Sequence, residues 1–162
     1  MSKPKGLYIL ANRERIYGPD QQTAIADLVD IIGPPLAAED AMAHPELLAQ
    51  VELIFSGWGA PKLDEPFLDA CPKLKAFFYG AGSVRDFTTD AFWERNIILT
   101  SSYAANAVPV SEFAISAIFL SLKNVWRFSQ HIKTHHTYPP NEVRQMVAGG
   151  YGATVGLISL GM

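Results

Sequence analysis

Short apolar runs alternate with polar, helix-like segments along the first hundred residues. Between the runs, the segments 20–28, 44–50 and 89–95 have helical character, and Asp64 and Thr89 are suited to cap two short helices. Strands that alternate with helices at this spacing predict a parallel sheet with helices on both faces, a flavodoxin-like α/β fold. The expected strands are residues 7–10, 29–32, 51–55, 74–79 and 97–100.

A long apolar helix is predicted to follow, over residues 106–131. Asn106 can cap it, and Pro109 suits its first turn. The helix is apolar on most sides, so we expect it to be buried between domains or subunits. Its longest apolar stretch, residues 113–122, is shorter than the roughly 20 residues of a membrane span.

The final residues resemble the start of a nucleotide-binding unit. The apolar run 154–160 predicts a buried parallel strand, and Gly161 follows where a phosphate-binding turn would open. A third glycine, the next helix and further strands do not follow in this sequence. We therefore expect residues 150–162 to be a stub of a Rossmann domain, whose unpaired strand is covered in an oligomer or is disordered.

Composition narrows the classes of function. The chain has a formal charge of −3 and no basic stretch, so nothing favours nucleic acid or an anionic membrane. Its one cysteine, Cys71, excludes an intrachain disulfide and suits a reducing compartment. The apolar run 7–11 is too short for a signal-peptide core. A cytoplasmic location is therefore expected.

Two strand ends carry candidate binding residues. Gly80, Ala81, Gly82 and Ser83 follow the fourth strand, and their consecutive N–H groups can bind a small carboxylate or form an ordinary turn. Trp58, between two glycines after the third strand, either lines the same pocket or packs against the adjacent helix. Tyr79 is a third candidate for contact with a substrate.

Other reactive side chains suggest no site. His131, His135 and His136 have partly metal-like spacing, but they lack a nearby glutamate or cysteine. Surface histidines at a helix end are the preferred interpretation, and no metal is expected. Cys71 has no obvious base partner, which favours a buried structural thiol over a nucleophile.

From residue 74 onward, the chain resembles the D-isomer-specific 2-hydroxyacid dehydrogenases. The similar segments are 74–76 leading into 80–82, 96–100 leading to Asn106, Val110-Ser111-Glu112 at the start of the long helix, and 152–161 at the end. The resemblance covers residues 74–162, whereas residues 1–73 agree in organisation only. Each segment is weakly specific alone, and their order and spacing carry the match.

The resemblance implies an oxidoreductase that transfers hydride between a nicotinamide cofactor and a 2-hydroxy or 2-oxo acid. Residues 1–105 would form the substrate domain, 106–131 an interdomain and dimerisation helix, and 150–162 the start of the NAD-binding domain. Asn106, Ser159 and Gly161 would lie on the cofactor side. The family's catalytic arginine, glutamate and histidine map to no residue of this chain. The chain alone is therefore expected to be inactive and not to bind NAD or NADP, and it is expected to form a homodimer or higher homo-oligomer.

Two departures from the family pattern leave alternatives open. Ser159 stands at the first fingerprint glycine, and Val84-Arg85 replaces an acidic residue, so that Arg85 is free to meet an anion. The alternatives are a non-enzymatic flavodoxin-like binding or signalling module and a dehydrogenase-derived regulatory protein. A receiver domain is disfavoured because Ala11-Asn12-Arg13 replaces its acidic residues. The same turn lacks the hydroxyl-rich phosphate loop of a flavodoxin.

Overall fold

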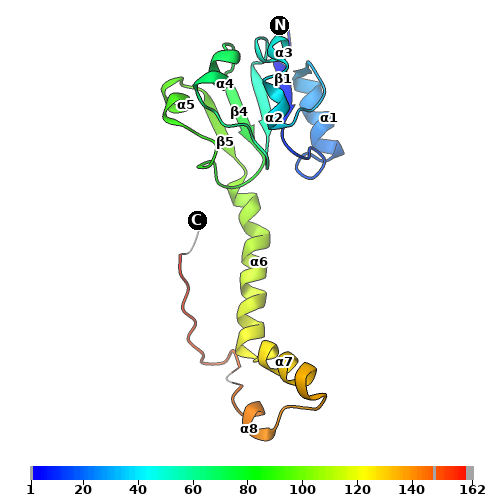
Figure 1. Ribbon diagram of the computed structural model, residues 1–162, viewed down its shortest axis with the longest axis vertical. Coiled ribbons are helices and arrows are strands. Elements are labelled where there is room, and N and C mark those ends of the chain that lie inside the picture. Colours follow the sequence, from blue (N-terminus) through cyan, green and yellow to red (C-terminus); the bar gives the residue numbers. More distant parts are fainter. Residues whose placement is uncertain (1, 148, 160–162) are drawn as a thin grey trace. The chain divides into compact units, whose positions relative to one another are not determined.

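The computed structural model describes residues 2–147 and 149–159 (Figure 1). The chain divides into two compact units, Met1–Ala105 and Asn106–Met162. The first unit contains the sheet, and the second consists of helices and an extended segment.

The first unit is a parallel five-stranded sheet of order β2-β1-β3-β4-β5. This order is that of flavodoxin-like folds, so the predicted fold class is confirmed. The strands are β1 (Lys5–Ile9), β2 (Asp30–Ile31), β3 (Leu53–Ser56), β4 (Ala76–Tyr79) and β5 (Ile98–Ser101). The helices are α1 (Pro19–Leu28), α2 (Ala38–Ala41), α3 (Pro45–Leu48), α4 (Glu65–Ala70) and α5 (Asp90–Glu94).

Alternation along the strands produces a core on each face of the sheet. Leu7 and Ile9 of β1 join a cluster that includes Phe77 and Phe92, and this cluster is covered by α2 to α5. Tyr8 lies on the opposite face, where the partly buried Ile25 of α1 packs against its cluster. Helices therefore cover both faces, because side chains of successive strand residues point in opposite directions.

The two predicted caps are confirmed. The Asp64 carboxylate accepts a hydrogen bond from the Phe67 N–H at 3.2 Å, at the start of α4. The Thr89 hydroxyl accepts from the Phe92 N–H at 3.3 Å, at the start of α5. Each side chain satisfies an N–H group that has no partner within its own helix.

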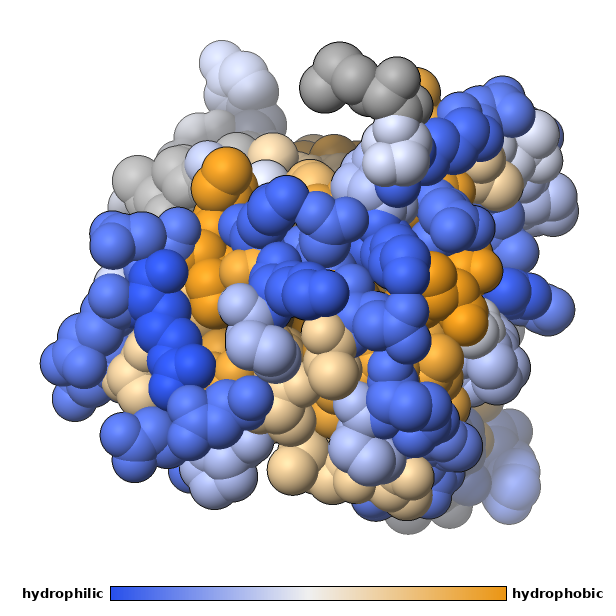
Figure 2. All heavy atoms as spheres, turned by 90° about the horizontal axis from the view of Figure 1, so that it is seen from above, coloured by the Kyte–Doolittle hydropathy of each residue, from blue (hydrophilic) through white to orange (hydrophobic). Residues whose placement is uncertain are grey.

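The amino ends of the strands carry charged side chains. Glu52 accepts hydrogen bonds from the Lys75 ammonium at 2.5 Å and from the Lys5 backbone N–H at 3.0 Å. These two bonds lower the pKa of the Glu52 carboxyl, with the Lys75 bond the larger cause. Figure 2, seen from this end, shows hydrophilic side chains over most of the face, with apolar patches between them.

The long helix differs from its prediction at both ends. Helix α6 spans Tyr103–Leu122, so Asn106 lies inside it and caps nothing, and Pro109 lies in its interior. The Ser102 N–H still bonds to Tyr79, so the chain leaves the sheet there and can turn directly into the helix. Asn124 then adopts a left-handed φ of 54°, which separates α6 from α7 (Val125–His135). One continuous helix to residue 131 is therefore wrong, because asparagine tolerates this conformation and interrupts the helix.

Helix α6 exposes apolar side chains all around its axis, and none of its residues is buried. The side chain of Phe113 is 75% exposed and that of Val110 is 60% exposed. By length and composition alone, α6 is apolar enough to cross a membrane, a test that core helices of soluble proteins also pass. The expected burial of this helix is therefore not provided by the described residues of one chain.

The predicted strand near the end of the chain does not form among its described residues. Residues 154–159 have no strand conformation, and Leu160 lies outside the described part. A strand requires a neighbouring strand to bond its N–H and C=O groups, and no described strand lies beside this segment. The preceding helix α8 spans only Asn141–Arg144.

Candidate functional site

Three loops meet at the carboxyl ends of β1, β3 and β4, the edge where parallel sheets bind ligands. The loop after β1 is tied to the loop after β3 by a hydrogen bond from the Ala11 N–H to the Trp58 carbonyl, 3.0 Å long. Gly59, with a φ of 79°, lies so close that an added Cβ would be 2.7 Å from that of Ala11. The first two loops are therefore in direct contact.

Ile16 packs the turn after β1 onto the other two loops. A Cβ added to Gly57 would lie 1.9 Å from Ile16 Cδ1, and one added to Gly80 would lie 2.3 Å from Ile16 Cγ2. A larger residue at either position would force Ile16 to move, so glycine suits both positions. Gly80 thus has a packing role, and its predicted contact with a ligand stays a prediction.

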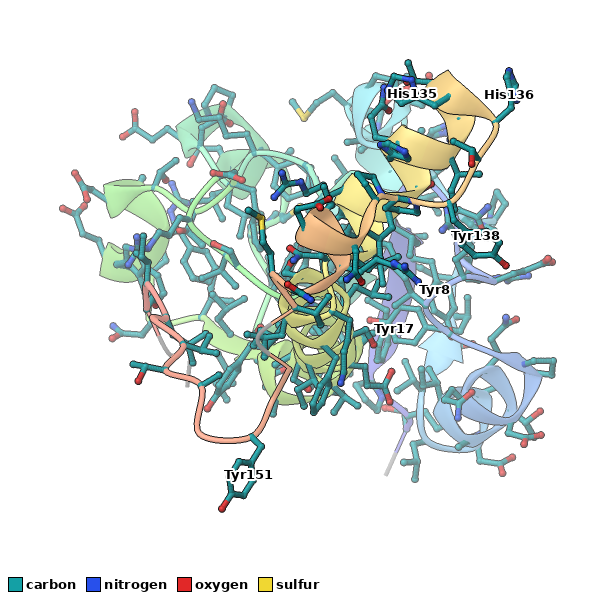
Figure 3. All side chains as sticks on the ribbon, turned by 90° about the horizontal axis from the view of Figure 1, so that it is seen from below. Tyr8, Tyr17, His135, His136, Tyr138 and Tyr151 are labelled. Atoms are coloured by element: carbon teal, nitrogen blue, oxygen red, sulfur yellow. The ribbon has the colours of Figure 1, made fainter. Side chains whose placement is uncertain are left out.

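Tyr17 fastens the same turn to the sheet. Its hydroxyl lies 2.9 Å from the Ser56 carbonyl and 3.1 Å from the Phe78 carbonyl, and can donate to either. Burial raises the pKa of Tyr17 well above its ordinary value, so the hydroxyl remains a donor. Its ring lies 5.5 Å from that of Tyr8, and Figure 3, seen from this edge of the sheet, labels both residues.

The turn after β4 leaves three adjacent N–H groups available. The Gly80 N–H donates to the Ser56 carbonyl at 2.9 Å, whereas those of Ala81, Gly82 and Ser83 have no partner among the described residues. The Ser101 hydroxyl lies 3.0 Å from the carbonyl oxygen of Ala81 and 2.6 Å from that of Gly82, and it fixes this peptide segment. Consecutive free N–H groups of this kind can bind an anion. We call residues 81–83 the amide cradle.

The other predicted substrate residues are placed in different surroundings. Tyr79 is buried, and its ring packs 4.6 Å from that of Phe87 on the face covered by α2 to α5. Trp58 is half exposed, and the Arg15 guanidinium lies 5.9 Å from the centre of its indole. A substrate role for either residue stays a prediction.

The residues proposed for the cofactor side lie in α6 and near the end of the chain. Asn106 lies within α6, Ser159 has a left-handed φ of 66°, and Gly161 lies outside the described residues. Without a strand over 154–159, there is no strand-to-helix turn there to place N–H groups at a pyrophosphate. A cofactor role for Asn106, Ser159 and Gly161 therefore stays a prediction.

Sequence reasoning missed the contribution of the turn after β1. Arg13 and Arg15 lie on this turn, and the Arg13 guanidinium lies 5.6 Å from the centre of the Tyr8 ring. The available signal was the position of two arginines directly after the first strand, at the end of the sheet where ligands bind. The packing of Ile16 onto two glycines had no sequence signal, because it joins residues distant in the chain.

The histidines and the cysteine do not extend the site. The rings of His131 and His135 lie 4.5 Å apart, and the described residues contain no group of three or more potential metal ligands. Cys71 is 3% exposed, and burial raises the pKa of its thiol to about 12. A thiol that stays protonated is a poor nucleophile, which agrees with the structural role predicted for it.

Comparison with known proteins relates this geometry to solved structures. No protein-family model and no curated protein matches the chain. A phosphoglycerate oxidoreductase from Rhizobium etli matches with a TM-score of 0.64 and 13% identity, over 90% of this chain and 45% of its own. An NAD-dependent formate dehydrogenase from Staphylococcus aureus matches with a TM-score of 0.60 and 18% identity, over 88% and 44%.

A third match extends the comparison to another activity. The NADPH-dependent glyoxylate/hydroxypyruvate reductase of Sinorhizobium meliloti has a TM-score of 0.58 and 20% identity, over 86% of this chain and 42% of its own. The chain thus spans less than half the length of each of these structures. All three are members of the D-2-hydroxyacid dehydrogenase family. The resemblance seen in the sequence is therefore confirmed in the fold, which this chain shares with members of that family over about nine-tenths of its length.

Proposed function

We propose that this chain provides the substrate side of a nicotinamide-dependent oxidoreductase that acts on a 2-hydroxy or 2-oxo acid. The observation that carries the proposal is the amide cradle, where three free N–H groups lie at the carboxyl edge of a parallel sheet. The similar solved structures, which include the NAD-dependent and NADPH-dependent enzymes named above, support the class of reaction. The proposal includes both NAD and NADP as the nicotinamide cofactor.

The cradle's part in this function is to bind and orient the acid. A carboxylate that accepts hydrogen bonds from adjacent amides is held with a defined direction, which places the neighbouring 2-oxo carbon in a fixed position. The hydride comes from the nicotinamide when that cofactor is bound. Ser101 keeps the cradle in shape through the contacts of its hydroxyl with the carbonyl oxygens of Ala81 and Gly82.

Ser101→Ala tests the proposal through binding. Titration calorimetry would compare 2-oxobutyrate with 2-butanone, which has a methyl group in place of the carboxylate. We expect the wild-type chain to bind only the acid, and Ser101→Ala to weaken that binding about threefold to tenfold by releasing the cradle carbonyls. Ser116→Ala, which removes an exposed hydroxyl of α6, is the matched control. Equal binding of acid and ketone would overturn the proposal.

We further propose that a polypeptide of these 162 residues does not turn over substrate by itself. None of the four histidines lies in the loops 11–18, 57–59 or 80–83, so these loops supply no imidazole to exchange a proton with the ketone oxygen. Purified chain with NADH and glyoxylate or hydroxypyruvate should show no loss of NADH absorbance. Turnover would contradict this expectation.

A second copy of the chain is proposed as the partner of α6. The helix exposes Val110, Phe113 and Ile115, and a self-association surface removes such apolar groups from water in a chain that stays outside the membrane. A cytoplasmic location belongs to the same proposal.

A further inference from the structure

Two arginines on the turn after β1 are held against aromatic rings. The Arg13 guanidinium carbon lies 5.6 Å from the centre of the Tyr8 ring, and that of Arg15 lies 5.9 Å from the centre of the Trp58 ring. Tyr8 is 2% exposed, so the ring beneath Arg13 is itself fixed in the core. Stacking of this kind orients a guanidinium and leaves its edge free for hydrogen bonds.

Neither guanidinium is neutralised by the described part of the protein. No described carboxylate forms an ion pair with Arg13 or Arg15, although Glu14 lies between them in the sequence. Nε of Arg13 is buried without a hydrogen-bond partner, whereas its terminal nitrogens are neither buried nor bonded to a described residue. Holding a partly desolvated cation without a partner is costly, and such an arrangement calls for an explanation such as a bound anion.

The turn lies at the same edge of the sheet as the amide cradle. Ile16, the residue after Arg15, packs against Gly80, the residue before the cradle. Tyr17 bonds to the carbonyl of Phe78 in β4. The arginines and the cradle are thus carried by loops that pack against each other at one edge of the sheet.

We propose that Arg13 and Arg15 bind a second anionic group of the substrate, a carboxylate or a phosphate at the end distant from the 2-oxo acid carboxylate. The inference rests on the proposed function, which assigns the first carboxylate to the amide cradle. It names the substrate class as dianionic 2-hydroxy or 2-oxo acids. Arginine suits this role because its planar fork can donate two hydrogen bonds to one carboxylate or phosphate.

The test compares two acids that share a five-carbon chain, 2-oxoglutarate and 2-oxopentanoate, which differ by the second carboxylate. Dissociation constants would be measured by calorimetry with the complete 162-residue chain. We expect 2-oxoglutarate to bind about tenfold more tightly, as for a charge-assisted hydrogen-bonded pair. Phosphohydroxypyruvate against hydroxypyruvate forms the second arm, and the pair with the larger ratio identifies a phosphate or a carboxylate as the preferred group.

Substitutions test whether Arg13 and Arg15 cause the tighter binding of 2-oxoglutarate. The double variant Arg13→Gln with Arg15→Gln should bring the ratio of the two affinities to about one. Arg144→Gln removes one positive charge from α8 and is the control for loss of an arginine elsewhere, expected to keep the full ratio. Arg13→Lys keeps the charge but loses the planar fork, and it should lose part of the preference. Because each ratio compares two ligands on one protein, partial unfolding cannot imitate the result.

The outcomes separate this inference from the function on which it rests. Equal wild-type affinity for both acids, or a preference that survives the double variant, would overturn the role of the arginines and leave the cradle intact. Failure of every 2-oxo acid to bind would overturn both. A preference that Arg13→Lys retains in full would overturn recognition by the guanidinium fork.

Discussion

The loops after β1 and β4 pack closely because residue 80 is a glycine. An added Cβ would lie 2.3 Å from Ile16 Cγ2, a β-branched atom that cannot swing away freely. We therefore predict that Gly80→Ala lowers the free energy of unfolding by about 1–3 kcal/mol through overpacking. Urea denaturation would measure the loss, with Gly156→Ala as the control, since nothing lies within 4 Å of a Cβ there. Equal stability of the two variants would contradict the close packing.

Tyr17 gives the fold a pH dependence in alkali. Its pKa is raised above the ordinary value of 10.0, chiefly by burial, so the folded state keeps a proton that the unfolded chain releases. Its contribution to stability is therefore complete below pH 10 and is lost as the pH rises above that value. Denaturation at several pH values should show a smaller alkaline loss for Tyr17→Phe than for the wild type. Parallel profiles would show that Tyr17 is not responsible.

At the residue scale, the sequence predicted a candidate binding turn at residues 80–83 but not the packing role of Gly80. The motif 80–83 predicted a cradle, and the structure leaves the N–H groups of Ala81, Gly82 and Ser83 available while that of Gly80 is used by Ser56. The space at Gly80 is taken by Ile16, which is 64 positions earlier in the numbering. Such a contact depends on tertiary packing, which no local pattern reveals.

Among the elements, short helices depend on their caps. The Asp64 carboxylate accepts from the Phe67 N–H at the first turn of α4. We predict that Asp64→Ala lowers the free energy of unfolding by about 0.5–2 kcal/mol. Asp27→Ala, at an exposed position of α1 with no ion pair to another described residue, should change it little. Thermal denaturation of both variants would measure this, and an equal melting temperature would show that the cap contributes nothing.

Element prediction succeeded where local signals and tertiary contacts agreed. The strands of the sheet and the caps at Asp64 and Thr89 could be predicted, because burial and side-chain oxygens specify them locally. The strand expected over 154–160 could not form among its described residues without a neighbour, and the short helix α2 was missed. The end of α6 at Asn124 depends on one residue in a left-handed conformation, which an apolar pattern does not show.

For the whole molecule, the exposed surface of α6 leads to a prediction about assembly. If a second copy covers this helix, Phe113→Asp should shift the chain from dimer to monomer, because Phe113 is 75% exposed in one chain. Light scattering with size-exclusion chromatography would measure the mass. Tyr151→Asp places the same charge at another fully exposed aromatic residue and should leave the dimer intact. A wild-type monomer would contradict the proposal.

The central claim is that residues 81–83 bind the carboxylate of a 2-oxo acid. The most direct measurement is an amide NMR titration of the chain with 2-oxobutyrate, followed in parallel with 2-butanone. We predict that the amide signals of Ala81, Gly82 and Ser83 shift with the acid and not with the ketone, because only the acid has a carboxylate to accept hydrogen bonds from their free N–H groups. Saturable shifts elsewhere with no change at these three amides would contradict it.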